Sequence, residues 1–372
     1  MRRTAALPLA IAAVLALGAC GGSADDAPSS TTPEPTADVG DASAVTPVDD
    51  EVLEAAKEEG EVLMYTNAED QQTAPIKKAF EAAYPEITLR SLPLEDQQMF
   101  QRYDTEVATG SPTADVVMSN DALGWLDFIE AGNVEPYADP NAANLPDYAT
   151  LGPGVYAISE DPVIALFNKA LLPEAEQPTT MEGLAAMAEE LDGRIGTTAL
   201  DNSVAYGATS AYLGKYGEDG WANLEAIGPH ASVEASSGPL ATKLAQGQYA
   251  AAFFVGGAVR AFIVDDVAKV VNYRYFEDGT PLLPRGLGVT AEAPHPNAGK
   301  VFLNWMLSVE GQEAACEGGF TPYRDGVECD FGLPQVIAAV GGEDNLNIGT
   351  YDRSLAEDED AITSRWNEAF GR

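Results

Sequence analysis

The sequence predicts an α/β protein with two lobes of alternating strands and helices. From about position 50 onward, apolar runs that read as strands alternate with amphipathic segments of ten or more residues that read as helices. Strands separated by such helices form parallel βαβ units. The alternation is interrupted once and then resumes, and the folded part of about 320 residues suits two lobes better than one core.

The first run of elements begins with a helix near 50–59. Strands are expected at 62–65, 87–89 and 114–118, and helices at 71–83, 95–109 and 121–131. Tyr84-Pro85 closes the second helix and Gly132 ends the fourth, because proline cannot continue a helix and glycine favours its end.

The segment 141–168 changes character, since its two strand-like runs have no helix between them. This pattern indicates a crossover between lobes. We therefore expect lobe 1 at 51–160 plus 276–372 and lobe 2 at 161–275.

The alternation resumes beyond the crossover. Strands are expected at 194–200, 231–235, 250–255 and 269–275, and helices at 181–191, from 204, from 239 and at 257–266. A return strand at 281–289 and a helix at 296–316 follow, and the apolar face of that helix is formed by Val301, Phe302, Trp305 and Met306. A stripe at this spacing indicates core packing rather than a site.

The N-terminus resembles a bacterial lipoprotein signal. Arg2 and Arg3 precede an apolar stretch at 5–17, and Leu17-Gly18-Ala19-Cys20 resembles the lipobox whose cysteine is lipidated. The apolar stretch is shorter than the roughly 20 residues that span a bilayer. We expect an exported protein, lipid-anchored at Cys20 to the outer face of the cell membrane. The alternative is a secretory peptide in which Cys20 is incidental.

Residues 21–50 are rich in Gly, Ser, Thr, Pro, Ala and Asp and have no apolar periodicity. Such a composition predicts a disordered acidic linker. The net charge of −39 argues against binding to nucleic acid, which attracts basic surfaces. The acidic run at 357–360 is interpreted as a solvated face rather than a metal site.

Two cysteines remain in the folded part, Cys316 and Cys329. In an oxidising compartment this pair predicts a disulfide, and two free thiols are the alternative. The sequence has no C-x-x-C motif and no Cys/His zinc spacing, so neither redox nor zinc chemistry is indicated.

Catalytic motifs are missing from this sequence. His230 and His295 are its two histidines, and H-E-x-x-H, G-x-S-x-G and Walker motifs do not occur. His295 stands at the start of a predicted helix, where a surface cap position is the simpler interpretation. We expect no enzyme and no cofactor, although carboxylate pairs leave a secreted hydrolase as an alternative.

Several motifs between residues 58 and 330 follow one another in a recognisable order. They are GEVLMYTNAEDQ (60–71), ADVVMSNDALGWLDFIEAGNVEPY (114–137), VIALFNKALL (163–172), KLAQGQYAAAFFV (243–255), FEDGTPLLPRGLGV (276–289) and APHPNAGKVFLNWMLSVEGQEA (293–314). Together they resemble the periplasmic-type solute-binding proteins of ABC transporters, and the last two resemble the subgroup of ferric-iron and 2-aminoethylphosphonate binders.

The resemblance implies two doubly wound α/β lobes joined by a hinge, a periplasmic binding protein type II-like fold with its ligand cleft between the lobes. It also implies a small-molecule ligand and an ABC permease as partners. We expect a monomer whose contact with the membrane is its lipid anchor alone. A surface protein that merely contacts partners, without an interlobe cleft, is a third possibility.

Polar residues follow the predicted strands, where ligands bind in open α/β sheets. The candidates are Thr66, Asn67, Ser119, Asn120 and Asp121 in the first lobe and Asn202, Ser203, Tyr206, Ser236, Ser237 and Gly238 in the second. Ser203 and Ser237 have the alternative role of helix caps.

We expect an anionic ligand, held by backbone N–H groups near Ser203 and Ser237, with Arg260 or Arg285 as charge partner. Tyr206 and Trp125 are candidates to frame its organic part, with core packing as the alternative.

Ferric iron is the second candidate ligand, and a polyamine is a further one. Ferric binders of the resembled subgroup use two adjacent tyrosines just after the strand at 250–255, whereas this chain has Val255-Gly256-Gly257-Ala258-Val259-Arg260 there. Fe³⁺ prefers anionic oxygen ligands, so this replacement disfavours it and no metal site is predicted. Tyr273 and Tyr275 are interpreted as a packing pair on one strand face.

The lipobox generates a first prediction. Cys20→Ala should leave the protein unlipidated, so that it leaves the membrane fraction while its folded body still binds ligand. Fractionation with a high-salt wash measures this. An alanine variant that stays with the membrane would show that the anchor lies elsewhere.

Overall fold

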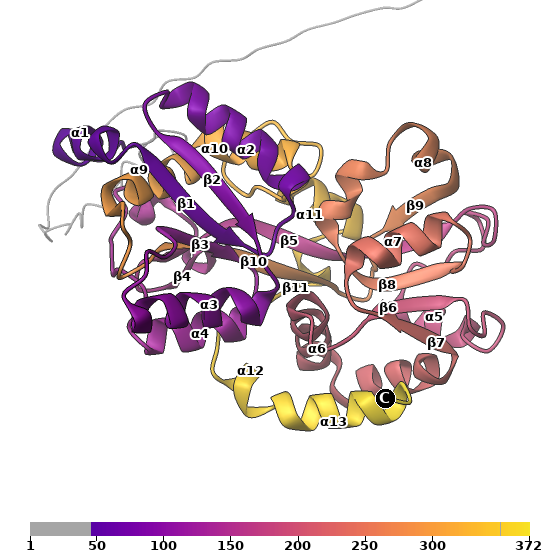
Figure 1. Ribbon diagram of the computed structural model, residues 1–372. Coiled ribbons are helices and arrows are strands. Elements are labelled where there is room, and N and C mark those ends of the chain that lie inside the picture. The colour runs from indigo at the N-terminus through magenta and orange to yellow at the C-terminus, as the bar shows by residue number, and fades with distance from the viewer. Residues whose placement is uncertain (1–45, 350) are drawn as a thin grey trace, which may run out of the picture. The chain divides into compact units, whose positions relative to one another are not determined.

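A computed structural model describes residues 46–349 and 351–372 (Figure 1). The predicted signal, Cys20 and residues 21–45 of the predicted linker lie outside the described residues. Thr46 already contacts the folded body, because its N–H donates to Asn141 Oδ1 at 2.7 Å and its carbonyl accepts from Asn304. None of the helices in the described part of the chain has the length and apolar character needed to cross a bilayer.

The first strands and helices alternate as predicted. They are α1 (Asp50–Glu59), β1 (Glu61–Thr66), α2 (Asp70–Ala83), β2 (Thr88–Pro93), α3 (Asp96–Thr109), β3 (Val116–Ser119) and α4 (Ala122–Glu130). β1 is parallel to both β2 and β3, so the carboxyl ends of these three strands lie at one edge of the sheet.

One strand, β5 (Val155–Asn168), connects the two halves of the sheet. The sequence predicts two strand-like runs here, but they form one strand of 14 buried residues. Residues 155–162 pair with the antiparallel β10 (Thr280–Val289), and residues 163–168 pair with β8 (Ala251–Gly256) and β9 (Val271–Arg274). Short elements precede it, namely two 3₁₀ turns at 142–144 and 147–149 and the strand β4 (Thr150–Gly152).

The elements after β5 repeat the alternation. They are α5 (Met181–Met187), β6 (Ile195–Thr198), α6 (Ser203–Ile227), β7 (Ala231–Glu234), α7 (Ser237–Ala245), β8 (Ala251–Gly256), α8 (Asp265–Val270) and β9 (Val271–Arg274). β6 is parallel to β7 and β8, which makes a second parallel group. The main strand order is β2-β1-β3-β10-β5-β8-β6-β7, with β4, β9 and β11 (Leu346–Ile348) paired beside it.

The predicted helix at 257–266 is wrong. A 3₁₀ turn (Gly257–Phe262) comes first, and α8 begins only at Asp265. Arg260 Nε donates to the Gly257 carbonyl at 2.6 Å, so a side chain uses an acceptor that an α-helix would give to the backbone. A Cβ at Gly257 would lie 2.3 Å from the Pro162 carbonyl oxygen, which shows how closely this turn packs against β5.

The last elements are α9 (Pro296–Met306), α10 (Val309–Glu317), α11 (Leu333–Val340), β11 (Leu346–Ile348), α12 (Ser354–Glu357) and α13 (Glu359–Ala369). The predicted helix at 296–316 is therefore two helices. Ser308 caps α10 by accepting the N–H of Gly311 at 3.1 Å. A Cβ at Gly311 would lie 2.1 Å from the Trp305 carbonyl oxygen, so glycine permits the tight junction.

The apolar stripe predicted for α9 is buried, with Phe302 and Met306 fully inaccessible. The C-terminal helix α13 packs against α6, since Trp366 and Phe370 share a buried cluster with Leu224 and Ile227. The lobe division expected from the sequence places this helix in lobe 1. The division of the chain into lobes stays a prediction.

The predicted disulfide joins Cys316, near the end of α10, to Cys329 in the following loop. The alternative of two free thiols is wrong. The bridge closes a loop whose ends are 13 residues apart in sequence.

Replacing both cysteines, Cys316→Ser with Cys329→Ser, should lower the free energy of unfolding by about 3 kcal/mol, because the loop constraint on the unfolded chain is lost. Urea denaturation without reductant measures the difference. Wild-type protein unfolded with reductant is the control and should match the double variant. Equal stability of wild type and variant without reductant would contradict the prediction.

Candidate functional site

The carboxyl ends of both groups of parallel strands surround a cavity of about 780 Å³, which we call the cleft. The turns after β1, β2, β3, β6, β7 and β8 all contribute to its lining. Eight of the thirteen predicted ligand-binding residues line it: Asn67, Asn120, Asn202, Ser203, Ser236, Ser237, Gly238 and Arg285. These residues are far apart in the sequence but lie around one cavity beyond the strand ends, where ligands bind in open α/β sheets.

Two further candidates are buried below the cleft and shape its turns. Thr66 Oγ1 accepts the N–H of Ala68 at 3.0 Å, and Ser119 Oγ accepts the N–H of Asp121 at 3.0 Å. Both residues have no exposed surface. They position the chain around the cleft without lining it.

Arg260 is not brought to the cleft. Its side chain is 1% exposed and donates to the Gly257 carbonyl, to Thr321 Oγ1 at 2.6 Å and to the hydroxyl of Tyr275. Trp125 is also buried, and its Nε1 donates to the Ser119 carbonyl at 3.0 Å. Of the two arginines proposed as charge partners, Arg285 is the one that lines the cleft.

The two serines predicted at helix starts are not helix caps. Asn202 caps α6, because its side chain accepts the N–H of Val204 at 3.2 Å, and Ser203 is the first helical residue. Ser237 is the first residue of α7, and its Oγ accepts the N–H of Gly256 at 3.0 Å. The N–H groups in the first turn of each helix have no acceptor within the helix, so they are suited to an acceptor from outside it.

Arg285 is the centre of a buried polar network. Its Nε donates to Asp161 Oδ2 at 2.9 Å, its Nη1 donates to Asn67 Oδ1 at 2.6 Å, and its guanidinium lies 4.9 Å from the centre of the Phe320 ring. Asp161 Oδ1 accepts the N–H of Thr321 at 3.2 Å. The charge of Arg285 is thus already paired within the protein.

The network continues through Asn67 to Asp96. Asn67 Nδ2 donates to Asp96 Oδ1 at 2.6 Å and to Asn120 Oδ1 at 2.7 Å, and Asp96 Oδ2 accepts the N–H of Ser203 at 3.2 Å. Sequence reasoning missed Asp96. The signal was present, because Asp96 is the first residue of the helix after β2 and so follows the same strand-end rule as the other candidates.

The charged side chains that line the cleft are mostly acidic. Glu69, Glu95, Asp96 and Asp161 contribute carboxylates, whereas Arg285 contributes a guanidinium. An anionic group in the cleft must therefore be held at contact distance by N–H groups rather than by an excess of positive side chains.

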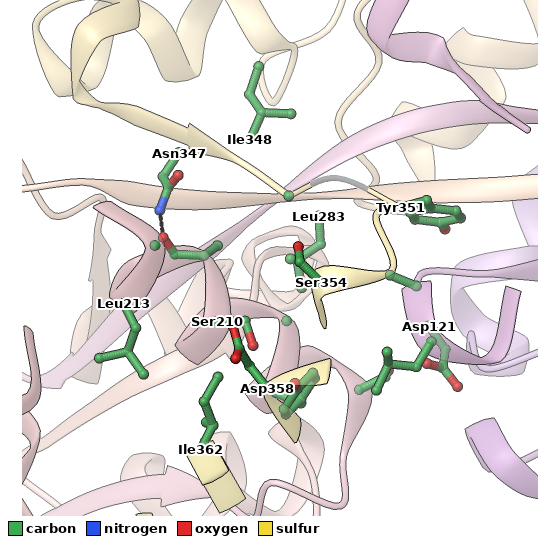
Figure 2. Close-up of a pocket in the computed structure, with 18 of the residues that line it drawn as sticks. Asp121, Ser210, Leu213, Leu283, Asn347, Ile348, Tyr351, Ser354, Asp358 and Ile362 are labelled. Carbon is green, nitrogen blue, oxygen red and sulfur yellow. Dashed lines mark hydrogen bonds between the residues drawn. The ribbon is translucent and has the colours of Figure 1, made fainter. Parts of the chain in front are cut away.

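A second cavity of about 570 Å³ lies between α6 and the C-terminal segment (Figure 2). Asp121 and Tyr206, the remaining two candidates, line this cavity and not the cleft. Figure 2 shows Tyr351, Ser354 and Asp358 of the C-terminal segment around the same space.

Asp121 caps α4 by accepting the N–H of Gly124 at 3.1 Å. Burial raises the pKa of its carboxyl from the ordinary 3.8 to about 7, and the nearby charges of Asp96 and Glu359 add to this effect. Asp121 is therefore a carboxyl group that titrates near neutral pH.

The residues considered for iron have structural partners. The rings of Tyr273 and Tyr275 lie 5.6 Å apart, which confirms the predicted packing pair. His295 precedes α9 at the cap position, and its Nδ1 lies 3.1 Å from Asp115 Oδ2. In residues 46–349 and 351–372, no three His, Cys, Asp or Glu side chains are grouped so as to hold a metal ion.

Comparison with known proteins places this fold and cleft in a family. A family model described as bacterial extracellular solute-binding protein matches residues 75–336. The chain belongs to this family of solute-binding proteins. A search of curated protein sequences finds no match to this solute-binding protein.

Solved structures share the fold of this solute-binding protein. The substrate-binding protein of an ABC transporter from Agrobacterium tumefaciens has a TM-score of 0.74 at 20% identity, over 88% of this chain and 98% of that one. AfuA from Actinobacillus pleuropneumoniae, with fructose-6-phosphate bound, has a TM-score of 0.69 at 18% identity, over 84% and 99% of the two chains. Iron-bound HitA from Pseudomonas aeruginosa has a TM-score of 0.67 at 17% identity, over 83% and 99%.

The raised pKa of Asp121 predicts a pH-dependent stability. The folded state holds this proton more tightly than the unfolded state, so the free energy of unfolding should fall as the pH rises from about 4 to about 7. Asp121→Asn keeps the cap acceptor and removes the ionisation, and should flatten this part of the profile. Each pKa unit corresponds to about 1.4 kcal/mol.

Urea denaturation at several pH values measures the effect. The control is Asp201→Asn, at an exposed carboxyl group in a neighbouring turn. If the control variant changes the profile as much as Asp121→Asn does, burial of Asp121 is not the cause.

Proposed function

We propose that this protein is the receptor of an ABC importer, which captures a small polar ligand outside the cell and delivers it to the permease. The observation that carries the proposal is the cleft, where turns from two parallel strand groups converge on about 780 Å³. This volume lies within the range of sites for small organic molecules. Membership of the extracellular solute-binding family supports the same conclusion.

The proposed ligand carries an anionic group, such as a phosphonate, phosphate ester or carboxylate. The N-termini of α6 and α7 both point their first turns at the cleft, and helix N-termini favour negative charge. Arg285 orients the turn after β1 through Asn67, so it supports this site more than it neutralises the ligand.

Ferric iron is the competing ligand. Iron-bound HitA shares the fold of this protein. The carboxylates around the cleft are hard oxygen ligands of the kind that Fe³⁺ prefers. The binding test therefore includes Fe³⁺ and a polyamine beside the organic anions.

We infer a receptor and not an enzyme. The secreted hydrolase is the rival from another class, and incubation with generic ester and phosphoester substrates separates the two. Saturable binding without turnover supports the receptor, and turnover supports the hydrolase.

The proposed setting is the outer face of the cell membrane, where a lipid on Cys20 holds the protein and the permease is its membrane partner. We propose that the receptor acts as a monomer. Native mass spectrometry of freshly purified protein reads both the oligomeric state and the mass of any retained ligand.

A charge placed at the start of α7 tests the anion site. The side chains introduced by Ser237→Asp and Ser237→Asn have nearly the same size and differ in charge. The affinity of the aspartate variant for organic anions should therefore be roughly tenfold or more below that of the asparagine variant. Ser237→Ala is the poorer control, because it removes the hydrogen bond to Gly256.

Thermal shift with phosphonates, phosphate esters and carboxylates measures the effect, since a ligand at a hundredfold above its Kd stabilises the protein by about 2.7 kcal/mol. The anion proposal fails if these compounds leave the melting temperature unchanged while Fe³⁺ or a polyamine raises it.

A further inference from the structure

Asp96 connects the two sides of the cleft. It is the first residue of α3, and its Oδ2 accepts the N–H of Ser203, the first residue of α6, at 3.2 Å. Asp96 is buried, with 8% of its surface exposed. A carboxylate from one strand group therefore occupies the helix N-terminus of the other.

The second oxygen of Asp96 is held by a neutral partner. Asp96 Oδ1 accepts from Asn67 at 2.6 Å, and Asn67 in turn accepts from Arg285. Arg285 is already paired with Asp161, so the charge of Asp96 is balanced chiefly by N–H donors and by the positive end of α6. Nearby Asp121 is one of the groups that opposes a further negative charge here.

A similar arrangement occurs at α7. A Cβ at Gly238, in the first turn of α7, would lie 3.5 Å from Glu69 Oε1. Both helix starts that the proposed function assigns to the ligand's anion are thus approached by carboxylates of this chain. Of the two, Asp96 makes the direct backbone hydrogen bond.

We infer that Asp96 is an internal substitute for the ligand's anionic group at α6. In the ligand-free protein it holds the cleft closed, and an anionic ligand must displace it to reach the N–H of Ser203. The displacement step rests on the proposed function, whereas the closing contact does not. A contact that stabilises a closed, empty cleft lowers the apparent affinity for the ligand.

The test compares two substitutions of matched chemistry. Asp96→Asn removes one charge and keeps the shape of the side chain. Glu95→Gln removes the same charge from the preceding residue, which also lines the cleft but is exposed and makes no hydrogen bond to α6 among the described residues. Asp96→Ala removes the acceptor altogether and should give the larger effect.

The first readout needs no ligand. Spin labels at Gln101→Cys in α3 and Gln246→Cys after α7, two exposed positions, report the distance across the cleft in the full chain carrying Cys20→Ala. We expect a longer distance population in Asp96→Asn and Asp96→Ala, and the wild-type distribution in Glu95→Gln. Identical distributions in all four proteins overturn the closing role of Asp96.

The second readout is calorimetric titration with inorganic phosphate. Asp96→Asn should bind phosphate roughly tenfold more tightly than Glu95→Gln, because the α6 donors are released. If Asp96→Asn shows the longer distance but binds phosphate with the same affinity as Glu95→Gln, the displacement step is wrong. If phosphate binds to none of the proteins, the anion site of the proposed function fails, while the distances still decide the closing contact.

Discussion

The buried ion pair between Arg285 and Asp161 holds together the part of the molecule on which the cleft depends. Arg285 lies on β10 and Asp161 on β5, and both side chains are less than a tenth exposed. Removing one partner of such a pair costs about 3–5 kcal/mol, because the other charge is left buried and uncompensated. Asp161 also accepts the N–H of Thr321, so the pair ties the central strands to the loop that the Cys316–Cys329 disulfide closes.

Beside this ion pair, the neighbouring carboxyl groups of Glu160 and Asp161 lie in different environments. Glu160 precedes Asp161 on β5 and is fully buried, and neither oxygen of its side chain has a hydrogen-bond partner among the described residues. Burial and the adjacent Asp161 raise its pKa well above the ordinary value. The raised pKa favours the neutral form of Glu160, whereas Asp161 pairs with Arg285, whose Nε donates to Asp161 and whose Nη1 donates to Asn67.

From Asn67 the polar contacts reach both strand groups, through Asn120 after β3 and through Asp96 to the start of α6. In the proposed site, the groups that remain for a ligand are therefore chiefly backbone N–H donors at helix starts, within a cleft whose charged side chains are mostly acidic. We expect a site of this kind to discriminate by contact geometry rather than by net charge, because long-range fields are screened over about 8 Å at physiological salt. The extreme acidity of the chain, −39 overall, is accordingly no guide to the charge of its ligand.

The sequence by itself determined the alternation of strands and helices and the strand-end positions of Asn67, Asn120, Ser203 and Ser237, because periodicity and turn chemistry act over a few residues. Tertiary contacts decided the rest. The 3₁₀ turn at 257–262 forms because the Arg260 side chain takes a helix acceptor, and the break at Ser308 follows the close packing of Gly311 on Trp305. The direction of Arg260, away from the cleft, and the reach of Asp96 to a residue 107 positions later depend on how distant segments pack, which no local pattern encodes.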